Sequence, residues 1–270
     1  MATNAITAQT GQYVQANDLN IYYEVHSNGP PLLLLHGGTL TCRSWDAHIA
    51  TLGAHFQVFA LDSRGHGKTD NPTGRLSFRA MADDVAAFIQ ALQLDTPLIL
   101  GFSDGGQIAL ELGIHYPTLA RALVIVGAYS RLRESGMRFM HAFGVEGPHR
   151  VNFERMERER PSLVQGWKAQ HTLQGAGTWK TLLDQISEMW YAPLGYSEAD
   201  LRGGIAPTLI AVGDRDGAIP VEEATYLFRL MPNVELAVTP NAGHFFPDIT
   251  HPLFAQMLDF LLRHQAKPAA

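Results

Sequence analysis

The sequence contains a serine in a setting that can make it reactive. Ser103 lies at the centre of a Gly-Phe-Ser-Asp-Gly turn, which follows a continuous apolar run and precedes a segment with helical periodicity. A strand, sharp turn and helix force the middle residue toward a strained backbone conformation, and the flanking glycines leave room where a Cβ would collide with backbone. The hydroxyl then stands at a helix N-terminus, whose free N–H groups stabilise developing negative charge. We expect Ser103 to be a nucleophile, although this short pattern alone also fits an ordinary Gly/Ser loop.

A nucleophilic serine needs a general base, which we expect to be a histidine. Of the twelve histidines, His244 follows a strand predicted over residues 234–238, with a glycine before it and aromatic residues after it. Loops after parallel strands gather at the carboxyl edge of a sheet, which also presents Ser103. His36 and His66 lie on similar loops but beside glycines in tight turns, so we expect them to tie backbone together. The other histidines, His171 among them, are interpreted as structural or solvent-facing.

The base in turn needs a carboxylate, and two acids compete for that role in the loop Gly-Asp-Arg-Asp-Gly-Ala-Ile-Pro after the strand predicted over residues 207–212. Asp214 directly follows the strand and could pair with Arg215. Asp216 lies further along the turn, before the next predicted helix, and is favoured. The chain order is then Ser, Asp, His, which is the order of the triad built around this type of turn.

Attack on a carbonyl also requires donors for the oxyanion. We expect two backbone N–H groups, one from Asp104 after the nucleophile and one from Gly38 in the His-Gly-Gly turn. Glycine exposes its amide without a side chain in the way. Removing one such donor typically costs about 2.7–4 kcal/mol of transition-state stabilisation.

Alternating strands and helices must position these residues. Apolar runs bounded by turn residues predict strands over residues 13–16, 21–26, 32–35, 56–61, 97–102, 122–126, 207–212 and 234–238. Helical periodicity predicts helices over residues 45–54, 78–92 with Ser77 as the cap, 104–116, 221–230 and 251–264. The alternation predicts an α/β protein with a mostly parallel sheet and helices on both faces.

The alternation fails over residues 130–201, where strand-like runs are absent and large apolar residues recur at helical spacing. We interpret this segment as a helical cap inserted into a core formed by residues 1–129 and 202–270. Each cap tryptophan or methionine, taken singly, is more typical of helix packing than of a binding site. As a group some of them must line the pocket beneath the cap, and Trp167 and Trp190 are the candidates for substrate binding.

Composition limits the class of protein. The 270 residues are 46% hydrophobic and 17% charged with a formal net charge of −6, which is typical of a globular chain and argues against a nucleic-acid partner. Cys42 is the single cysteine, so no intramolecular disulfide forms. Residues 1–12 lack the pattern of a signal peptide and no segment is apolar enough to span a bilayer, so we expect a cytoplasmic protein. We expect a small-molecule substrate, no membrane partner and no cofactor. We also expect no metal, because acids and histidines do not recur at ligand spacing. A homodimer is left open.

Together these motifs resemble the α/β-hydrolase superfamily over residues 11–264, interrupted only by the cap. They comprise His-Gly-Gly at 36–38, Asp-Ser-Arg-Gly-His-Gly at 62–67, Gly-Phe-Ser-Asp-Gly-Gly at 101–106, Gly-Asp-Arg-Asp at 213–216 and Gly-His at 243–244. The resemblance implies an α/β-hydrolase fold with a helical cap and a Ser103–Asp216–His244 triad. The elbow, with aspartate after the serine and two glycines following, is similar to that of the biphenyl-hydrolase-like, valacyclovirase-like esterases, in which this aspartate holds the substrate's amino group.

Asp104 therefore has two interpretations. A carboxylate in the first turn of a helix stabilises it by about 0.3–1 kcal/mol through the helix dipole, with no ligand involved. A negative charge some 6 Å from a forming oxyanion, however, opposes it by about 3 kcal/mol at an effective dielectric near 20, so a substrate ammonium could provide the compensating charge.

The motifs indicate a carboxylesterase-type serine hydrolase of small carboxylic esters. Lactone hydrolysis, perhydrolysis and carbon–carbon bond hydrolysis use the same triad, and no sequence feature separates them. A slow-turnover small-molecule receptor is an alternative from another class.

Overall fold

The computed structural model describes residues 11–173, 175–244 and 247–265, and within them the chain forms an eight-stranded sheet of order β1-β2-β4-β3-β5-β6-β7-β8. Residues 1–10 lie outside the described residues, and they make up most of the segment in which we expect no signal peptide. The aromatic residues 245 and 246, which follow His244, also lie outside the described residues. The strands are β1 (Gln12–Ala16), β2 (Leu19–His26), β3 (Pro31–Leu35), β4 (Gln57–Leu61), β5 (Leu98–Phe102), β6 (Ala122–Val126), β7 (Thr208–Gly213) and β8 (Val234–Thr239). All the predicted strands are present.

The first two strands form a hairpin that pairs antiparallel with β4, whereas every pairing from β4 to β8 is parallel. Asn17 and Asp18 form the hairpin turn and both have positive φ, 48° and 62°. Left-handed residues at both central positions match the twist of a two-residue hairpin, and Asn and Asp tolerate this conformation better than other non-glycine residues. The sheet is therefore mostly parallel, as predicted, with an antiparallel edge.

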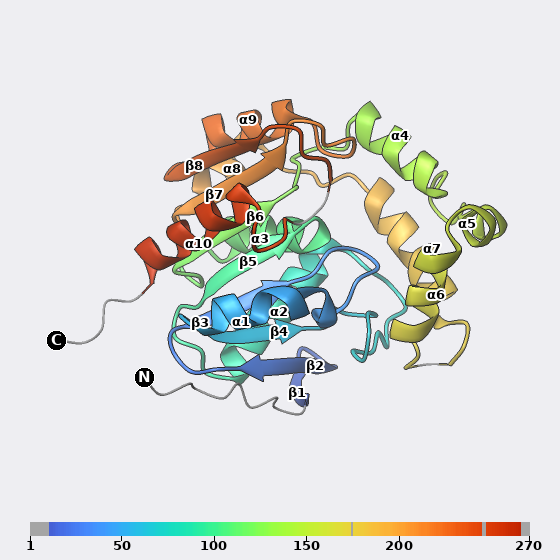
Figure 1. The fold of residues 1–270 in the computed structure, drawn as a ribbon, viewed down its shortest axis with the longest axis horizontal. Helices are drawn as coiled ribbons and strands as arrows, with labels where there is room; N and C mark the ends of the chain where they lie inside the picture. The colour runs from blue at the N-terminus through green and yellow to red at the C-terminus, as the bar shows by residue number, and fades with distance from the viewer. Residues whose placement is uncertain (1–10, 174, 245–246, 266–270) are drawn as a thin grey trace.

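Helices cover both faces of the sheet (Figure 1). Strand residues alternate between two apolar cores: Leu33 and Leu35 of β3 face one, while Leu32 and Leu34 face the other. The first core is closed by α2 (Phe78–Ala91), α3 (Asp104–His115), α8 (Glu198–Gly203) and α9 (Val221–Leu230), and the second by α1 (Asp46–Gly53) and α10 (Pro252–His264). Because side chains alternate along a strand, one buried apolar run can fill both layers.

Helix boundaries follow local signals. Ser77 accepts a hydrogen bond from Ala80 N at 3.1 Å and begins α2, as its cap role predicts. The helix expected from residue 45 begins differently, because Cys42–Trp45 form a 3-10 turn that continues into α1 at Asp46. A short 3-10 turn before an α-helix is common and is not visible in apolar periodicity.

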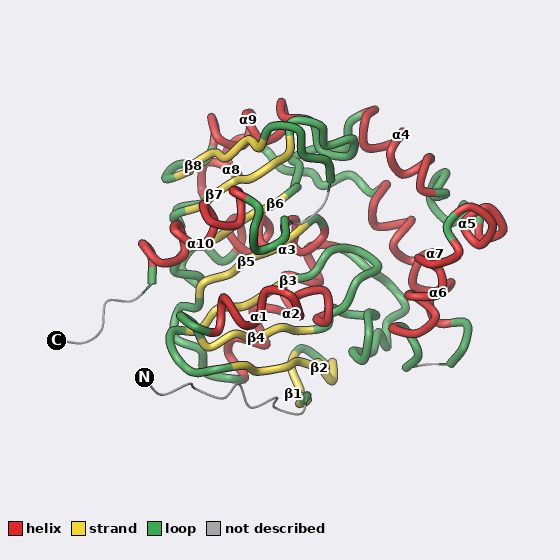
Figure 2. Tube along the Cα trace, in the orientation of Figure 1, coloured by secondary structure: helices red, strands yellow, loops and turns green. Residues whose placement is uncertain are grey.

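Five helices lie between β6 and β7, and Figure 2 shows no strand among them. They are α4 (Glu134–Phe143), α5 (Phe153–Glu159), α6 (Pro161–Gln170), α7 (Thr178–Tyr191) and the short α8. Helices α4 to α7 share a separate apolar core that includes Met140, Met156 and Trp179. In Figure 1 they stand beyond the carboxyl ends of the parallel strands. Leu182, Ile186 and Met189 of α7 also pack with the first core over the sheet, as does Leu201 of α8.

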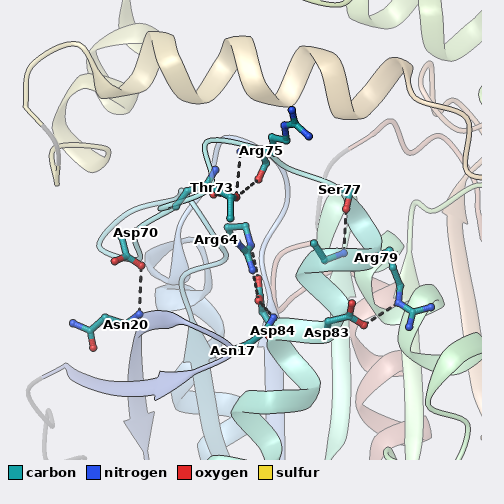
Figure 3. A network of polar contacts seen from close by, with 12 residues as sticks. Asn17, Asn20, Arg64, Asp70, Thr73, Arg75, Ser77, Arg79, Asp83 and Asp84 are labelled. Atoms are coloured by element: carbon teal, nitrogen blue, oxygen red, sulfur yellow. Dashed lines mark hydrogen bonds and ion pairs between the residues drawn. The ribbon is translucent and has the colours of Figure 1, made fainter.

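The loop after β4 is anchored by a buried ion pair. Arg64 donates from Nε to Asp84 of α2 at 2.8 Å, and Asn17 of the hairpin turn donates to the same carboxylate at 2.7 Å (Figure 3). Both charged side chains are more than nine-tenths buried. Hairpin, loop and α2 are thereby held together at the carboxyl end of β4.

None of the helices in the described residues is long and apolar enough to traverse a lipid bilayer.

Candidate active site

Ser103 stands on a strained turn between β5 and α3. Its backbone has φ 53° and ψ −116°, a conformation that non-glycine residues rarely adopt. Its N–H donates to Val126 O of the neighbouring strand at 2.8 Å, which holds the turn against β6. The turn places the Ser103 side chain at the first turn of α3, as the sequence predicts.

Three glycines allow this turn. A Cβ at Gly101 would overlap Gly105 O, one at Gly105 would overlap Leu35 O, and one at Gly106 would lie 2.8 Å from Val126 O. Each of these obstacles is backbone, which cannot move aside as a flexible side chain can. The glycines are therefore required by close packing of the helix start against β3 and β6, which gives a physical reason for the Gly-X-Ser-X-Gly-Gly pattern.

His244 joins Ser103 to Asp216 through its two ring nitrogens. Ser103 Oγ lies 3.0 Å from His244 Nε2, and His244 Nδ1 lies 2.7 Å from Asp216 Oδ2. A carboxylate only accepts, so Nδ1 carries the ring proton and Nε2 is free to accept from the hydroxyl. The imidazole also packs against Phe102 and the edge of Phe139, with ring centroids 5.4 and 5.5 Å away. His244 can therefore take a proton from Ser103 while Asp216 holds the ring in place.

Asp216 is held more firmly than its competitor. Its second oxygen, Oδ1, accepts from the backbone N–H groups of Ala218 and Ile219, each at 2.8 Å, and its side chain is only 3% exposed. Asp214 is 34% exposed, accepts from Ala242 N at 3.3 Å and lies away from His244. Of the two acids, the structure brings only Asp216 to the histidine.

Gly38 and Asp104 lie against each other beside the nucleophile. A Cβ at Gly38 would overlap the Asp104 carboxylate and lie 2.9 Å from Trp190 Cζ2, so any other residue there would displace one of these side chains. Asp104 is the first residue of α3, and the first N–H groups of a helix have no intrahelical acceptor. The two amides expected to receive an oxyanion thus come from adjacent segments, after β3 and after β5.

The Asp104 carboxylate is buried and has one side-chain donor. Trp190 Nε1 of α7 lies 2.9 and 3.0 Å from its two oxygens, and the residue is 6% exposed. Burial raises the pKa of Asp104 to about 6, against smaller opposing effects of the Trp190 hydrogen bond and of His244. The carboxylate thus contacts α7 rather than solvent, a contact that neither interpretation from the sequence included.

A cavity reaches Ser103 and His244 from beneath α4 and α7. Its walls include Asp104, Trp190 and Phe139. Trp167, the other tryptophan expected in the pocket, does not reach the cavity: it is buried in the core shared by α4 to α7, stacked on Trp179 at 6.0 Å. That expectation is corrected, because the apolar face of α6 packs against its neighbouring helices instead of the sheet edge.

The cavity also has a charged wall that sequence reasoning missed. It contains Arg131, Arg133 and Glu223, which come from the segment after β6 and from the first turn of α9. No local pattern around these residues distinguishes them from surface charges. Only the proximity of two distant segments brings them to the site.

His36 and His66 tie backbone together, as expected. His36 donates from Nδ1 to Gly37 O at 2.8 Å and accepts from Ser63 N at 3.0 Å, while His66 donates to Arg64 O at 2.9 Å. Burial lowers the pKa of both, so both stay neutral. His171 does more than the sequence indicates: it accepts from Gly67 N and donates to Thr39 O, linking the end of α6 to the turn that follows Gly38.

No cluster of three or more His, Cys, Asp or Glu side chains within the described residues could hold a metal ion.

The comparisons with known proteins agree with this fold. A family model described as the alpha/beta hydrolase family matches residues 32–255. A putative carbamate hydrolase, RutD, of Azorhizobium caulinodans is 30% identical over 259 residues, covering 91% of this chain and 96% of the relative. A 2-hydroxy-6-oxo-2,4-heptadienoate hydrolase of Pseudomonas putida is 26% identical over 253 residues, covering 89% and 91%. The solved structure of a thermophilic esterase from Thermogutta terrifontis superposes with a TM-score of 0.72 at 24% identity, covering 96% and 100%.

Proposed function

The chain belongs to the alpha/beta hydrolase family, and within this family we propose that it is a serine hydrolase that cleaves small carboxylic esters. The observation that carries the proposal is the continuous relay from Ser103 Oγ through His244 to Asp216, with separations of 3.0 and 2.7 Å. These three residues form the proposed catalytic triad. It opens into the cavity, so a substrate carbonyl can reach the serine.

In the first half-reaction, Ser103 Oγ attacks the ester carbonyl carbon while His244 Nε2 takes the hydroxyl proton. The carbonyl oxygen becomes an oxyanion that accepts from the backbone N–H groups of Gly38 and Asp104. The tetrahedral intermediate collapses as the bond to the alcohol oxygen breaks, and His244 gives its proton to that oxygen. The products are an ester on Ser103 and a free alcohol.

In the second half-reaction, water replaces the alcohol. His244 takes a proton from the water, the resulting hydroxide attacks the acyl carbon, and the proton returns to Ser103 as the acid leaves. Asp216 remains ionised throughout and stabilises the imidazolium, because its other oxygen is fixed by two backbone donors and cannot turn away.

For the acyl group we propose an amino-bearing substrate, whose ammonium would lie beside Asp104. The support is the burial of this carboxylate at the nucleophile, which raises its pKa to about 6 and would be offset by a cation in the cavity. Matched esters with and without an α-amino group test this. Wild type should favour the amino ester and Asp104→Asn should lose that preference; equal preference in both enzymes would contradict the idea.

Carbamate cleavage is the second candidate, since the relative named as a putative carbamate hydrolase is 30% identical over nearly the whole chain. A carbamate carbonyl can be attacked by the same serine. Parallel assays with esters and carbamates of the same alcohol separate the two, and a kcat/KM that is higher for the carbamate would replace the ester proposal.

A fluorophosphonate probe followed by intact-mass measurement tests the mechanism itself. We expect one adduct on Ser103 in wild type and none in Ser103→Ala. A panel of p-nitrophenyl esters graded in chain length then measures turnover, and a chain-length optimum would size the pocket. An unmodified Ser103 would contradict the serine mechanism, and a single stoichiometric reaction without cycling would indicate a receptor instead of an esterase.

A further inference from the structure

Two arginines on the cavity wall are held by one buried carboxylate. Glu223 is 0% exposed and accepts from Ser130 N at 3.0 Å, from Ser130 Oγ at 2.8 Å and from Arg133 Nε. Arg131 Nε lies 3.7 Å from the same carboxylate, and its guanidinium stacks over the Tyr226 ring at 5.1 Å. The arginines are therefore positioned before any ligand arrives.

The cluster of Arg131, Arg133 and Glu223 keeps an excess positive charge. Two guanidinium groups face one carboxylate, so the sum is about one positive charge at neutral pH. Arg133 donates to Glu223 from Nε, and within the described residues Glu223 is the only Asp or Glu that pairs with either arginine. Their side chains are 57% and 38% exposed, so a ligand in the cavity can reach the remaining donors.

This positive wall lies on the opposite side of the nucleophile from Asp104. The Asp104 carboxylate packs against Gly38, which follows β3, whereas Glu223 belongs to the helix after β7. Ser103 follows β5, which lies between β3 and β6 in the sheet order. Arg131 and Arg133 follow β6, and adjacent strands are about 4.8 Å apart, so the ends of β3 and β6 are separated by about 10 Å. In the order of the sheet, the acidic group lies toward β3 and the basic cluster toward β6 and β7.

We propose that Arg131 and Arg133 form an anion subsite that selects esters carrying a carboxylate at the end distant from Asp104. Guanidinium groups bind carboxylates through paired, charge-assisted hydrogen bonds. Glu223 is a positioning residue in this proposal, because it fixes Arg133 Nε and leaves the terminal nitrogens for the ligand. The inference rests on the proposed ester hydrolysis and goes beyond it by naming the substrate's charge.

The subsite is remote from the bond that breaks, so its effect should be mostly on binding. An interaction made equally in the ground state and the transition state lowers KM and leaves kcat unchanged. We expect kcat/KM to be about tenfold higher for the anionic ester than for the neutral one, which corresponds to a free-energy difference of about 1.4 kcal/mol. The preference should weaken as salt is added, because half-exposed charges are screened.

Two pairs of isosteric esters test the proposal and locate the carboxylate. Monomethyl adipate is compared with methyl 6-methylheptanoate for the acyl side, and O-acetylglycolate with isobutyl acetate for the alcohol side. Each is assayed by pH-stat with wild type, Arg131→Gln, Arg133→Gln and the control Arg138→Gln. Arg138 is an exposed arginine of α4 paired with Glu134, and it is not part of the cavity wall.

We expect wild type to favour the anionic ester in at least one pair. Both cavity variants should lose most of that preference through KM. The neutral ester is the internal reference for each variant, so the quantity compared is the ratio of kcat/KM for the anionic ester to that for the neutral ester. Arg138→Gln should keep the preference. Equal use of anionic and neutral esters by wild type, or an equal loss in the control, would overturn the subsite while leaving ester hydrolysis intact.

A second readout covers the case in which no ester is cleaved. Adipate should slow fluorophosphonate labelling of Ser103 in wild type and should not in Arg133→Gln. Protection without ester turnover would support the subsite while contradicting the proposed function. Adipate that leaves labelling unchanged, together with no ester turnover, would overturn both.

Discussion

Asp216→Asn changes one atom of the proposed relay and should nearly abolish activity. Oδ1 of Asp216 accepts two backbone N–H groups at 2.8 Å, so an asparagine will keep its carbonyl oxygen there and turn its NH2 toward His244. Two donors cannot face each other, so His244 Nδ1 must then accept. The ring proton moves to Nε2, and the imidazole can no longer accept the Ser103 proton.

The size of the expected loss in activity follows from losing the general base while the nucleophile and the oxyanion donors stay in place. The same exchange in serine proteases lowers kcat about 10⁴-fold, which is about 5 kcal/mol of transition-state stabilisation. We expect a similar loss in kcat/KM for p-nitrophenyl acetate and a comparable fall in the fluorophosphonate labelling rate. The thermal unfolding midpoint should change little, because all three hydrogen-bonding positions remain occupied.

Asp214→Asn is the matched control for this prediction. Asp214 lies two residues away on the same loop, but it is 34% exposed and does not contact His244. A surface substitution of this kind changes stability by about 0.5 kcal/mol or less, so activity should stay within about threefold. The reasoning would be refuted if Asp216→Asn kept more than a tenth of wild-type activity, or if Asp214→Asn lost as much.

Three further substitutions test other parts of the structure. Burial raises the pKa of Asp104 from 3.8 to about 6 in the folded protein, so ionisation of this carboxyl destabilises the fold as pH rises from about 4 to 6. Asp104→Asn should therefore be more stable than wild type at pH 7, by up to about 3 kcal/mol. In urea titrations, this difference in unfolding free energy should vanish below pH 4. Arg64→Ala leaves the buried Asp84 carboxylate without its arginine and should lower the free energy of unfolding by about 3–5 kcal/mol. The control Arg79→Ala removes an exposed i,i+4 pair with Asp83, which is worth about 0.3–0.5 kcal/mol. Similar unfolding midpoints for the two variants would contradict the role of the buried pair. Gly105→Ala places a methyl group on Leu35 O and should prevent soluble expression or remove all Ser103 labelling, and normal labelling would show that the turn can rearrange.

Local patterns were sufficient for the elements and for most of the proposed catalytic residues. An apolar run of four or five residues identifies a doubly covered strand, because only such a strand buries both faces. The position of each proposed catalytic residue after a strand then predicts that they meet, since parallel strands end at one edge. Ser103 and His244 are 141 positions apart, yet sheet topology alone brings their loops together.

Tertiary packing decided which cap residues face the cavity. Trp167 and Trp190 look alike in the sequence, because each belongs to the apolar face of an amphipathic helix. Trp167 turned into the core shared by α4 to α7, while Trp190 reached the Asp104 carboxylate. The difference depends on how four short helices pack on one another, and no local periodicity contains that information.

The sequence by itself determined the fold class, the strand and helix order and the three residues proposed to act on an ester, because each is written in local spacing. Only the tertiary structure decided the charge of the cavity. The Asp104 carboxylate meets Trp190 across 86 positions of chain, and the two arginines meet Glu223 across 90 and 92 positions. Such contacts join segments that are distant in the chain, so their energetics depend on burial and geometry that individual segments do not possess.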